Sequence, residues 1–197
     1  PSSVHSSAPP PPLYLKFRTT HRENLRYLKA IGIVDPNAKP HELPIPDAAA
    51  HMVSTIRHLK SKGFPDSAFA RLGFLTPQLF SLDYHPSDME PVFEFLTSEL
   101  EALPQDSVVL VTKCPEILFQ DVEYRLRPTL DYLKQLGLDK LNVPSTSNAH
   151  LLKIPVKKLD SKVKYLRSIG FSREEAAQAC ARLPAIFGYG IENNLRP

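Results

Sequence analysis

Residues 126–138 read LRPTLDYLKQLGL, and this stretch decides the fold. Its leucines at 126, 130, 133 and 136 recur at intervals of four and three residues, so they line one face of a helix. Gly137 is predicted to end that helix, because glycine readily adopts the left-handed conformation found after a helix C-terminus. Leu138 is then placed against Leu133 in a Schellman-type cap. The stretch therefore predicts an amphipathic helix with a defined stop.

The same phrase recurs along the chain. It appears as LKAIGI (28–33), LKSKGF (59–64), LKQLGL (133–138) and LRSIGF (166–171). Successive glycines are 31, 74 and 33 residues apart, and the interval of 74 holds one degenerate copy with Leu100 in place of the glycine. A second phrase keeps the same register, as TPQLF (76–80), CPEIL (114–118) and LPAIF (183–187). Self-similarity at this period predicts a solenoid, in which each unit buries its apolar face against its neighbours.

A second helix is expected after each glycine. In the last repeat Ser172 is a predicted N-cap and Glu175 completes a capping box, so residues 173–182 are predicted to be helical. A proline then breaks the helix, a short apolar turn follows, and another proline opens the next repeat. The sequence therefore predicts an all-α helical-repeat solenoid, each repeat holding two helices and a short helical turn. We expect Pro144 to interrupt the second helix of its repeat.

The two ends of the chain differ in composition. Residues 1–12 (PSSVHSSAPPPP) have no core-forming pattern, so residues 1–15 are predicted to be a Ser/Pro-rich tail or linker. Their acid-free composition fits the end of an organelle transit peptide. Residues 16–197 are predicted to form the repeat domain of about five repeats, the last one cut short, as expected for a fragment. No run approaches 18 apolar residues, so we expect no membrane-spanning helix and no membrane partner.

Positive charge concentrates in one segment of the second half. The net charge is +3, and residues 153–167 alone carry +5. The candidate phosphate-binding residues there are Lys153, Lys157, Lys158, Lys162, Lys164 and Arg167, opposed only by Asp160. Leu159, Val163, Leu166 and Ile169 are expected to form the buried stripe of this helix, with Lys158 and Lys162 flanking it. Basic side chains along a stacked helix can contact phosphates, and the alternative is an ordinary solvated face.

Three arginines form a second set of candidates. Arg125 and Arg127 lie just before Pro128, and Arg196 lies before Pro197 at the matching position. An arginine at a repeat junction could clamp a phosphate with two parallel hydrogen bonds, or form a salt bridge, for instance with Glu123. Lys113 and Arg182 each lie near a predicted helix C-terminus, where a cation suits the helix dipole.

Other chemistry finds little support in the sequence. The two cysteines, Cys114 and Cys180, are expected to be small buried residues rather than a disulfide. No metal-ligand spacing, catalytic triad order or phosphate-binding loop is evident, so we expect no enzyme activity, no cofactor and no metal site. Four tyrosines are expected to belong mostly to the core, and stacking on nucleic-acid bases is the alternative for each of them. They are Tyr124, Tyr132, Tyr165 and Tyr189.

Several of these stretches resemble one known family. Three stretches resemble the mitochondrial transcription termination factor (mTERF) family: LKSKGF (59–64), CPEILFQDVEYRLRPTLDYLKQLGL (114–138) and LRSIGFSREEAAQACARLPAIFGYGIENNLRP (166–197). The last of these stretches resembles the plant organelle members of the family in particular. The resemblance covers about residues 20–197. It implies an all-helical superhelix that binds nucleic acid along a concave basic face.

The resemblance also implies a role in organelle gene expression. We expect a non-enzymatic protein of transcription termination, transcription regulation or RNA processing, which binds double-stranded DNA, RNA or both. Components of the organelle transcription machinery are further candidate partners. The expected location is the chloroplast, with the mitochondrion as the alternative. A second hypothesis is a helical-repeat scaffold for protein interactions in an organelle transcription or ribosome-assembly complex.

Overall fold

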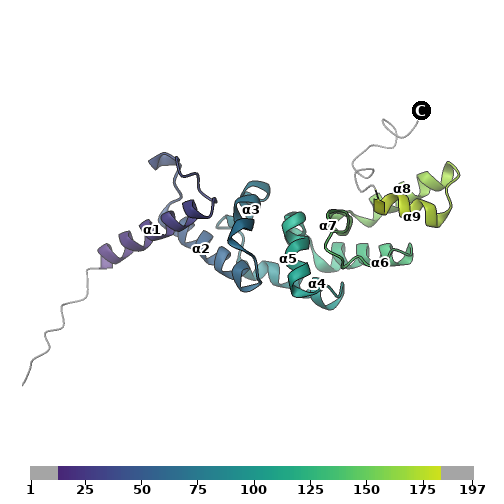
Figure 1. Ribbon diagram of the computed structural model, residues 1–197, viewed down its shortest axis with the longest axis horizontal. Helices are drawn as coiled ribbons and strands as arrows, with labels where there is room; N and C mark the ends of the chain where they lie inside the picture. The colour runs from purple at the N-terminus through teal and green to yellow at the C-terminus, as the bar shows by residue number, and fades with distance from the viewer. Residues whose placement is uncertain (1–12, 183–197) are drawn as a thin grey trace, which may run out of the picture.

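The computed structural model describes residues 13–182, which hold nine α-helices and no strand, as the repeat pattern predicts (Figure 1). The helices are α1 (Leu13–Ala30), α2 (Pro46–Ser61), α3 (Phe69–Leu75), α4 (Glu90–Ser98), α5 (Pro104–Lys113), α6 (Arg127–Gln135), α7 (Thr146–Lys153), α8 (Val156–Ser168) and α9 (Arg173–Arg182). Short 3₁₀ turns lie between them: η1 (Pro40–Glu42), η2 (Asp66–Ala68), η3 (Pro77–Phe80), η4 (Pro86–Met89) and η5 (Pro115–Phe119). A π-helical turn, η6 (Val122–Leu126), leads into α6.

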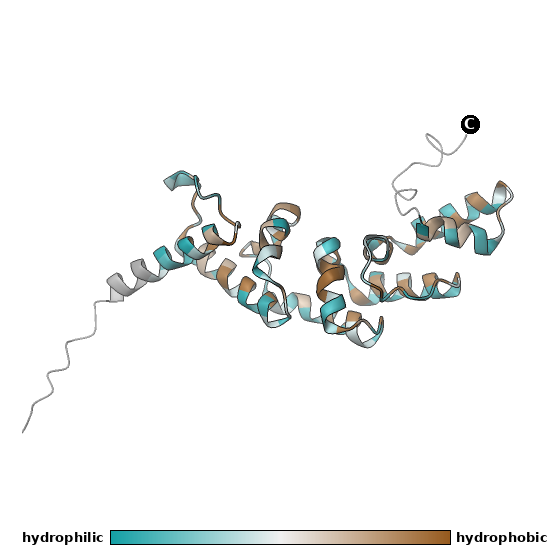
Figure 2. Cartoon of the chain, viewed as in Figure 1, coloured by the Kyte–Doolittle hydropathy of each residue, from teal (hydrophilic) through white to brown (hydrophobic). Residues whose placement is uncertain are grey.

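The helices follow one another along an elongated chain, from α1 at one end to α8 and α9 at the other (Figure 1). α6 packs against α8, and α5, α7 and α9 pack against one another in that order. Most of the coloured helices carry both hydrophobic and hydrophilic residues in Figure 2, as amphipathic helices do. Each unit thus buries its apolar face against the units next to it, which is the packing of a solenoid.

The glycine caps form as predicted. Gly32, Gly63, Gly137 and Gly170 have positive φ angles of 79°, 100°, 79° and 107°. The N–H of the residue after each glycine donates to the carbonyl five residues earlier, at 3.0 to 3.2 Å. These are the hydrogen bonds of the Schellman motif, which pair carbonyls that the helix leaves unsatisfied. The four recurring phrases therefore end their helices in the same way.

One repeat lacks the glycine cap, and another differs from the prediction in where its second helix begins. In the repeat without a glycine, Glu101 takes the left-handed conformation at φ 57° and Ala102 N–H donates to the Leu96 carbonyl at 2.9 Å. The prediction that Pro144 interrupts a helix is wrong, because α7 begins after it. Ser145 is the N-cap of α7, and its Oγ accepts a hydrogen bond from Asn148 N–H at 3.0 Å. The chain then passes from α7 through Pro155 directly into α8, without a 3₁₀ turn.

Several predicted helix starts and the leucine stripe of residues 126–138 agree with the structure. Glu175 N–H donates to Ser172 Oγ at 3.1 Å, and Ser172 N–H donates to the Glu175 carboxylate at 2.8 Å, which is the predicted capping box. Pro91 and Pro128 lie in the first turns of α4 and α6. The leucine stripe of the quoted stretch is buried at all four positions: Leu126, Leu130, Leu133 and Leu136.

Candidate nucleic-acid interface

Helix α8 carries most of the candidate phosphate-binding residues. It packs against α6 and α9 through a buried face that includes Leu159, Val163 and Leu166, as expected. Ile169, which was expected to extend this stripe, is 55% exposed, because α8 ends at Ser168 and the next residue no longer follows the helical face. The remaining surface of α8 faces solvent.

Three cations on this solvent face have no partner among the residues that the structure describes. Lys157, Lys158 and Arg167 are exposed, and within the described part of the chain they form no ion pair or side-chain hydrogen bond. Lys164 is also solvent-facing, with 74% of its side chain exposed, although it pairs with Asp160 at 2.7 Å. Lys157 and Lys164 are seven residues apart, about two helical turns, so they lie along one line of the helix. The exposed face of α8 is therefore strongly basic.

Lys162 lies elsewhere than expected. Only 4% of it is exposed, and it belongs to the buried face of α8 rather than to its flank. Burial and, after it, the nearby Lys158 lower the pKa of the Lys162 ammonium, since a low-dielectric site disfavours charge. The expectation that Lys162 flanks the stripe is wrong, and we do not retain it as a phosphate contact.

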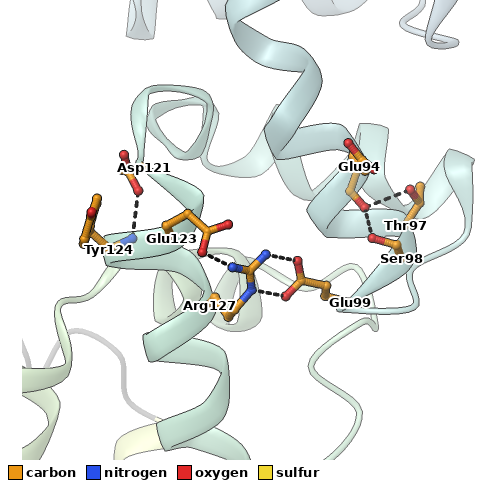
Figure 3. Close-up of polar contacts among 8 residues, drawn as sticks. All are labelled: Glu94, Thr97, Ser98, Glu99, Asp121, Glu123, Tyr124 and Arg127. Carbon is orange, nitrogen blue, oxygen red and sulfur yellow. Dashed lines mark hydrogen bonds and ion pairs between the residues drawn. The ribbon is translucent and has the colours of Figure 1, made fainter.

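Lys153 and Arg127 serve contacts between repeats. The Lys153 ammonium pairs with Glu116 Oε1 at 3.2 Å, joining the end of α7 to η5. Arg127 donates from Nε and Nη2 to the two carboxylate oxygens of Glu99, at 2.7 and 2.6 Å, and a further bond goes from Nη1 to Glu123 (Figure 3). The salt-bridge alternative for Arg127 is therefore the geometry that the structure shows.

These contacts alter the electrostatics of the Arg127 site. Hydrogen bonding to Glu99 and then to Glu123 raises the pKa of Arg127, and Arg127 in turn holds the pKa of Glu99 below its ordinary value. The planar guanidinium is the side chain best suited to such two-point pairing with a carboxylate. Arg127 thus links the start of α6 to the end of α4.

The remaining candidates are spread over the chain. Arg125 is exposed on η6 and has no partner among the described residues, and Tyr124 beside it is 83% exposed. Tyr132 is half-buried, and its hydroxyl donates to Asp160 at 3.1 Å, so it is not presented for stacking. Lys113 and Arg182 are the last residues of α5 and α9, where the helix dipole favours a cation. Arg196 and Tyr189 lie outside the described residues.

An acidic segment that is not among the predicted sites occupies the middle of the solenoid. Residues 83–123, here called the acidic unit, contain ten Asp or Glu residues and one Lys, for a net charge of −9. They include η4, α4, α5 and η5. The net charge of either half of the chain does not reveal this segment, because basic residues elsewhere in each half offset its negative charge. A phosphate backbone would be repelled here, so a basic surface cannot run unbroken along the described units.

The two thiols lie in the core of the protein. Both cysteines are free and buried, as predicted, and burial raises the pKa of Cys114 to about 12 and that of Cys180 to about 11. No group of three His, Cys, Asp or Glu side chains within residues 13–182 could hold a metal ion. Nor is any helix there long and apolar enough to cross a membrane.

Comparison with known proteins identifies the family. The mTERF family model matches residues 9–197, nearly the whole chain. The chain belongs to the mTERF family. Proteins of this family are in general nucleic-acid-binding regulators of gene expression in mitochondria or chloroplasts, and they generally act without catalysis. No curated protein matches the chain. The all-helical repeats, the glycine caps and the basic α8 thus occur in an mTERF protein.

Proposed function

We propose that this mTERF protein binds nucleic acid through the solvent face of α8, without catalysing a reaction. The observation that carries the proposal is a set of exposed cations on one helix, Lys157, Lys158 and Arg167, which have no side-chain partner within residues 13–182. Cations without an intramolecular partner can neutralise phosphates and release the counterions bound to them. Lys164 adds a fourth positive charge, although it must exchange Asp160 for a phosphate.

The dimensions of α8 suit a phosphate backbone. Ten residues separate Lys157 from Arg167, or about 15 Å at the rise of an α-helix. One strand of B-DNA carries a phosphate about every 3.4 Å along its axis, so this face could reach several phosphates. Contacts to phosphates carry no sequence information directly, so we expect binding through α8 to depend weakly on sequence. The same chemistry serves duplex DNA and RNA, and we propose both as ligands.

The biological role that we propose is regulation of organelle gene expression, by transcription termination, transcription regulation or RNA processing. The likeness of residues 166–197 to plant organelle members favours the chloroplast, and the mitochondrion is the alternative. The partners in this role are organelle DNA, organelle RNA and components of the transcription machinery. Basic side chains that contact phosphates need no cofactor.

A matched pair of triple variants tests the proposal by fluorescence anisotropy with labelled duplex DNA and single-stranded RNA. The test variant carries Lys157→Gln, Lys158→Gln and Arg167→Gln. The control carries Arg22→Gln, Arg26→Gln and Arg57→Gln, at three exposed positions of α1 and α2. Both variants lose three positive charges. We expect the test variant to bind about tenfold more weakly, because three surface contacts of about 0.5 kcal/mol each sum to about 1.5 kcal/mol. Equal weakening in both variants would mean that net charge, rather than α8, determines binding.

A further inference from the structure

Two hollows flank α4 inside the acidic unit. The first, of about 530 Å³, lies between α4 and η6 and is bordered by Asp88, Glu94, Glu99, Asp121 and Glu123. The second, of about 470 Å³, lies between the end of α2, α4 and α5, and its walls include Glu90, Phe93, Glu94 and Ser107. Glu94 borders both hollows. Helix α4 is thus an acidic ridge between two recesses.

The carboxylates around α4 differ in how far they are already engaged. Glu99 and Glu123 hold Arg127, as Figure 3 shows, and Glu90 holds Lys62 at 2.6 Å. Glu94 is exposed, and its carboxylate has no partner within residues 13–182; only its backbone carbonyl accepts hydrogen bonds, from Thr97 and Ser98. The hollows therefore accept cationic side chains from this chain, and they keep a free carboxylate between them.

The walls of the hollows offer more than charge. Pro91 and Phe95 line the first hollow, and Phe93 lines the second, where the Lys62 ammonium lies 5.5 Å from the centre of its ring. Lysine and arginine side chains cover apolar surface with their methylene stems while their charged ends reach polar groups. In the second hollow, Ser107 is 1% exposed and its Oγ has no hydrogen-bond partner in the described structure. This Oγ is closed to solvent, so a group in the hollow reaches it only if the surrounding side chains shift.

We propose that the acidic ridge of α4 docks a lysine- and arginine-rich segment of a protein partner. Nucleic acid fits poorly, because its phosphates would meet exposed carboxylates such as Glu94 that have no cation partner among the described residues. A basic polypeptide fits the charge, the apolar walls and the recesses, and Arg127 and Lys62 already show the contacts that it would make. This docking surface lies apart from α8, so the chain could bind a basic protein and nucleic acid at once. The inference does not rest on the function proposed above.

A charge-reversal series at Glu94 tests the proposal in the intact chain. The probe is a short fluorescein-labelled peptide rich in lysine and arginine, titrated by anisotropy. We expect Glu94→Gln to weaken peptide binding modestly and Glu94→Lys to weaken it about fivefold, the effect of one exposed ion pair worth about 1 kcal/mol. Glu174→Lys is the matched control, because Glu174 is exposed on α9 and has no partner in the described residues. It changes the net charge equally, and we expect it to leave peptide affinity unchanged.

Three results would overturn the docking proposal. The first is that the parent chain fails to bind the peptide at low salt. The second is that Glu94→Lys and Glu174→Lys weaken peptide binding equally. The third is that both Glu94 variants bind the peptide with unchanged affinity. Because the whole chain carries +3, net charge alone does not attract a basic peptide. The Glu94→Gln variant keeps the size of the side chain, so the test stands even if Glu94→Lys fails to fold. Nucleic-acid affinity, measured in parallel, should not fall in Glu94→Lys, which separates this surface from α8.

Discussion

Leu133 and Leu138 close the end of α6 around Gly137. Leu138 N–H donates to the Leu133 carbonyl at 3.1 Å, and both leucine side chains are buried, at 0% and 6% exposure. A single residue pair thus joins the backbone stop of the helix to the apolar core. The equivalent pairs Leu28–Ile33, Leu59–Phe64 and Leu166–Phe171 make the same backbone bond. This shared contact explains why the phrase recurs in the sequence.

Truncation of Leu133 should destabilise the chain strongly. Leu133→Ala removes a fully buried side chain from both the helix stripe and the cap, so we expect a loss of about 2–5 kcal/mol of unfolding free energy. Lys134→Ala, at the exposed neighbour, should change stability by less than about 0.5 kcal/mol. Urea denaturation followed by circular dichroism measures both. A loss below about 1 kcal/mol for Leu133→Ala would show that the core assignment is wrong.

Gly32 and Gly137 share a φ of 79° but differ in their surroundings. A Cβ at Gly137 would meet nothing within 4 Å, so Gly137→Ala should cost only the left-handed strain of about 1–2 kcal/mol. At Gly32 the new Cβ would lie 2.9 Å from the Ala70 Cβ on α3, so Gly32→Ala should cost more. Thermal unfolding of the two variants measures the difference. Equal losses would mean that α3 moves away from the α1 cap at no cost.

The salt bridge between Glu99 and Arg127 should make the stability of the folded chain depend on pH. Arg127 lowers the pKa of Glu99 in the folded state below its ordinary 4.5. The contribution of this salt bridge to stability is therefore complete above about pH 4.5. It is lost as the pH falls through the lower pKa that Glu99 has in the folded state. Glu99→Gln should destabilise the chain at neutral pH, and its difference from the parent should shrink in acid. Glu101→Gln, which removes an exposed carboxylate without a side-chain partner in the described structure, should show no such trend in urea titrations. A difference that is constant across pH would contradict the bridge.

The two thiols should react slowly in the folded protein. Burial raises the pKa of Cys114 to about 12 and that of Cys180 to about 11, so little thiolate is present near pH 8. We expect a disulfide reagent such as DTNB to modify neither residue rapidly in the native chain and both in guanidinium chloride. Rapid native modification of either thiol would show that its helix opens readily.

The helices could be predicted from the sequence because their signals are local. Gly137 ends α6, Ser172 and Glu175 start α9, and the leucine spacing marks the buried faces. Glu101 could not be predicted as a helix stop, since a non-glycine residue rarely takes positive φ. Pro144 was misread because a proline can also lie just outside a helix that it does not interrupt.

The candidate site was predicted less completely, although some of its signals were in the sequence. Lys162 lies three residues after Leu159 and four before Leu166, so helical spacing already places it within the buried stripe. The partners of Arg127 and Lys153 were harder to foresee. Glu99 and Glu116 come from other repeats, and only the packing of the units brings them into contact. The net charge of each repeat, taken separately, identifies the acidic unit from the sequence alone.

The salt dependence of binding tests the role of α8 most directly. Affinity for duplex DNA should fall with salt at a log–log slope of about 0.9 per phosphate neutralised. The variant Lys157→Gln/Lys158→Gln/Arg167→Gln should bind more weakly to every sequence tried, with a slope shallower than that of the parent by about two to three. The control at Arg22, Arg26 and Arg57 should keep the parent slope. If the α8 variant binds as tightly as the parent and with the same slope, the exposed cations of α8 are only a solvated face and the proposed function is wrong.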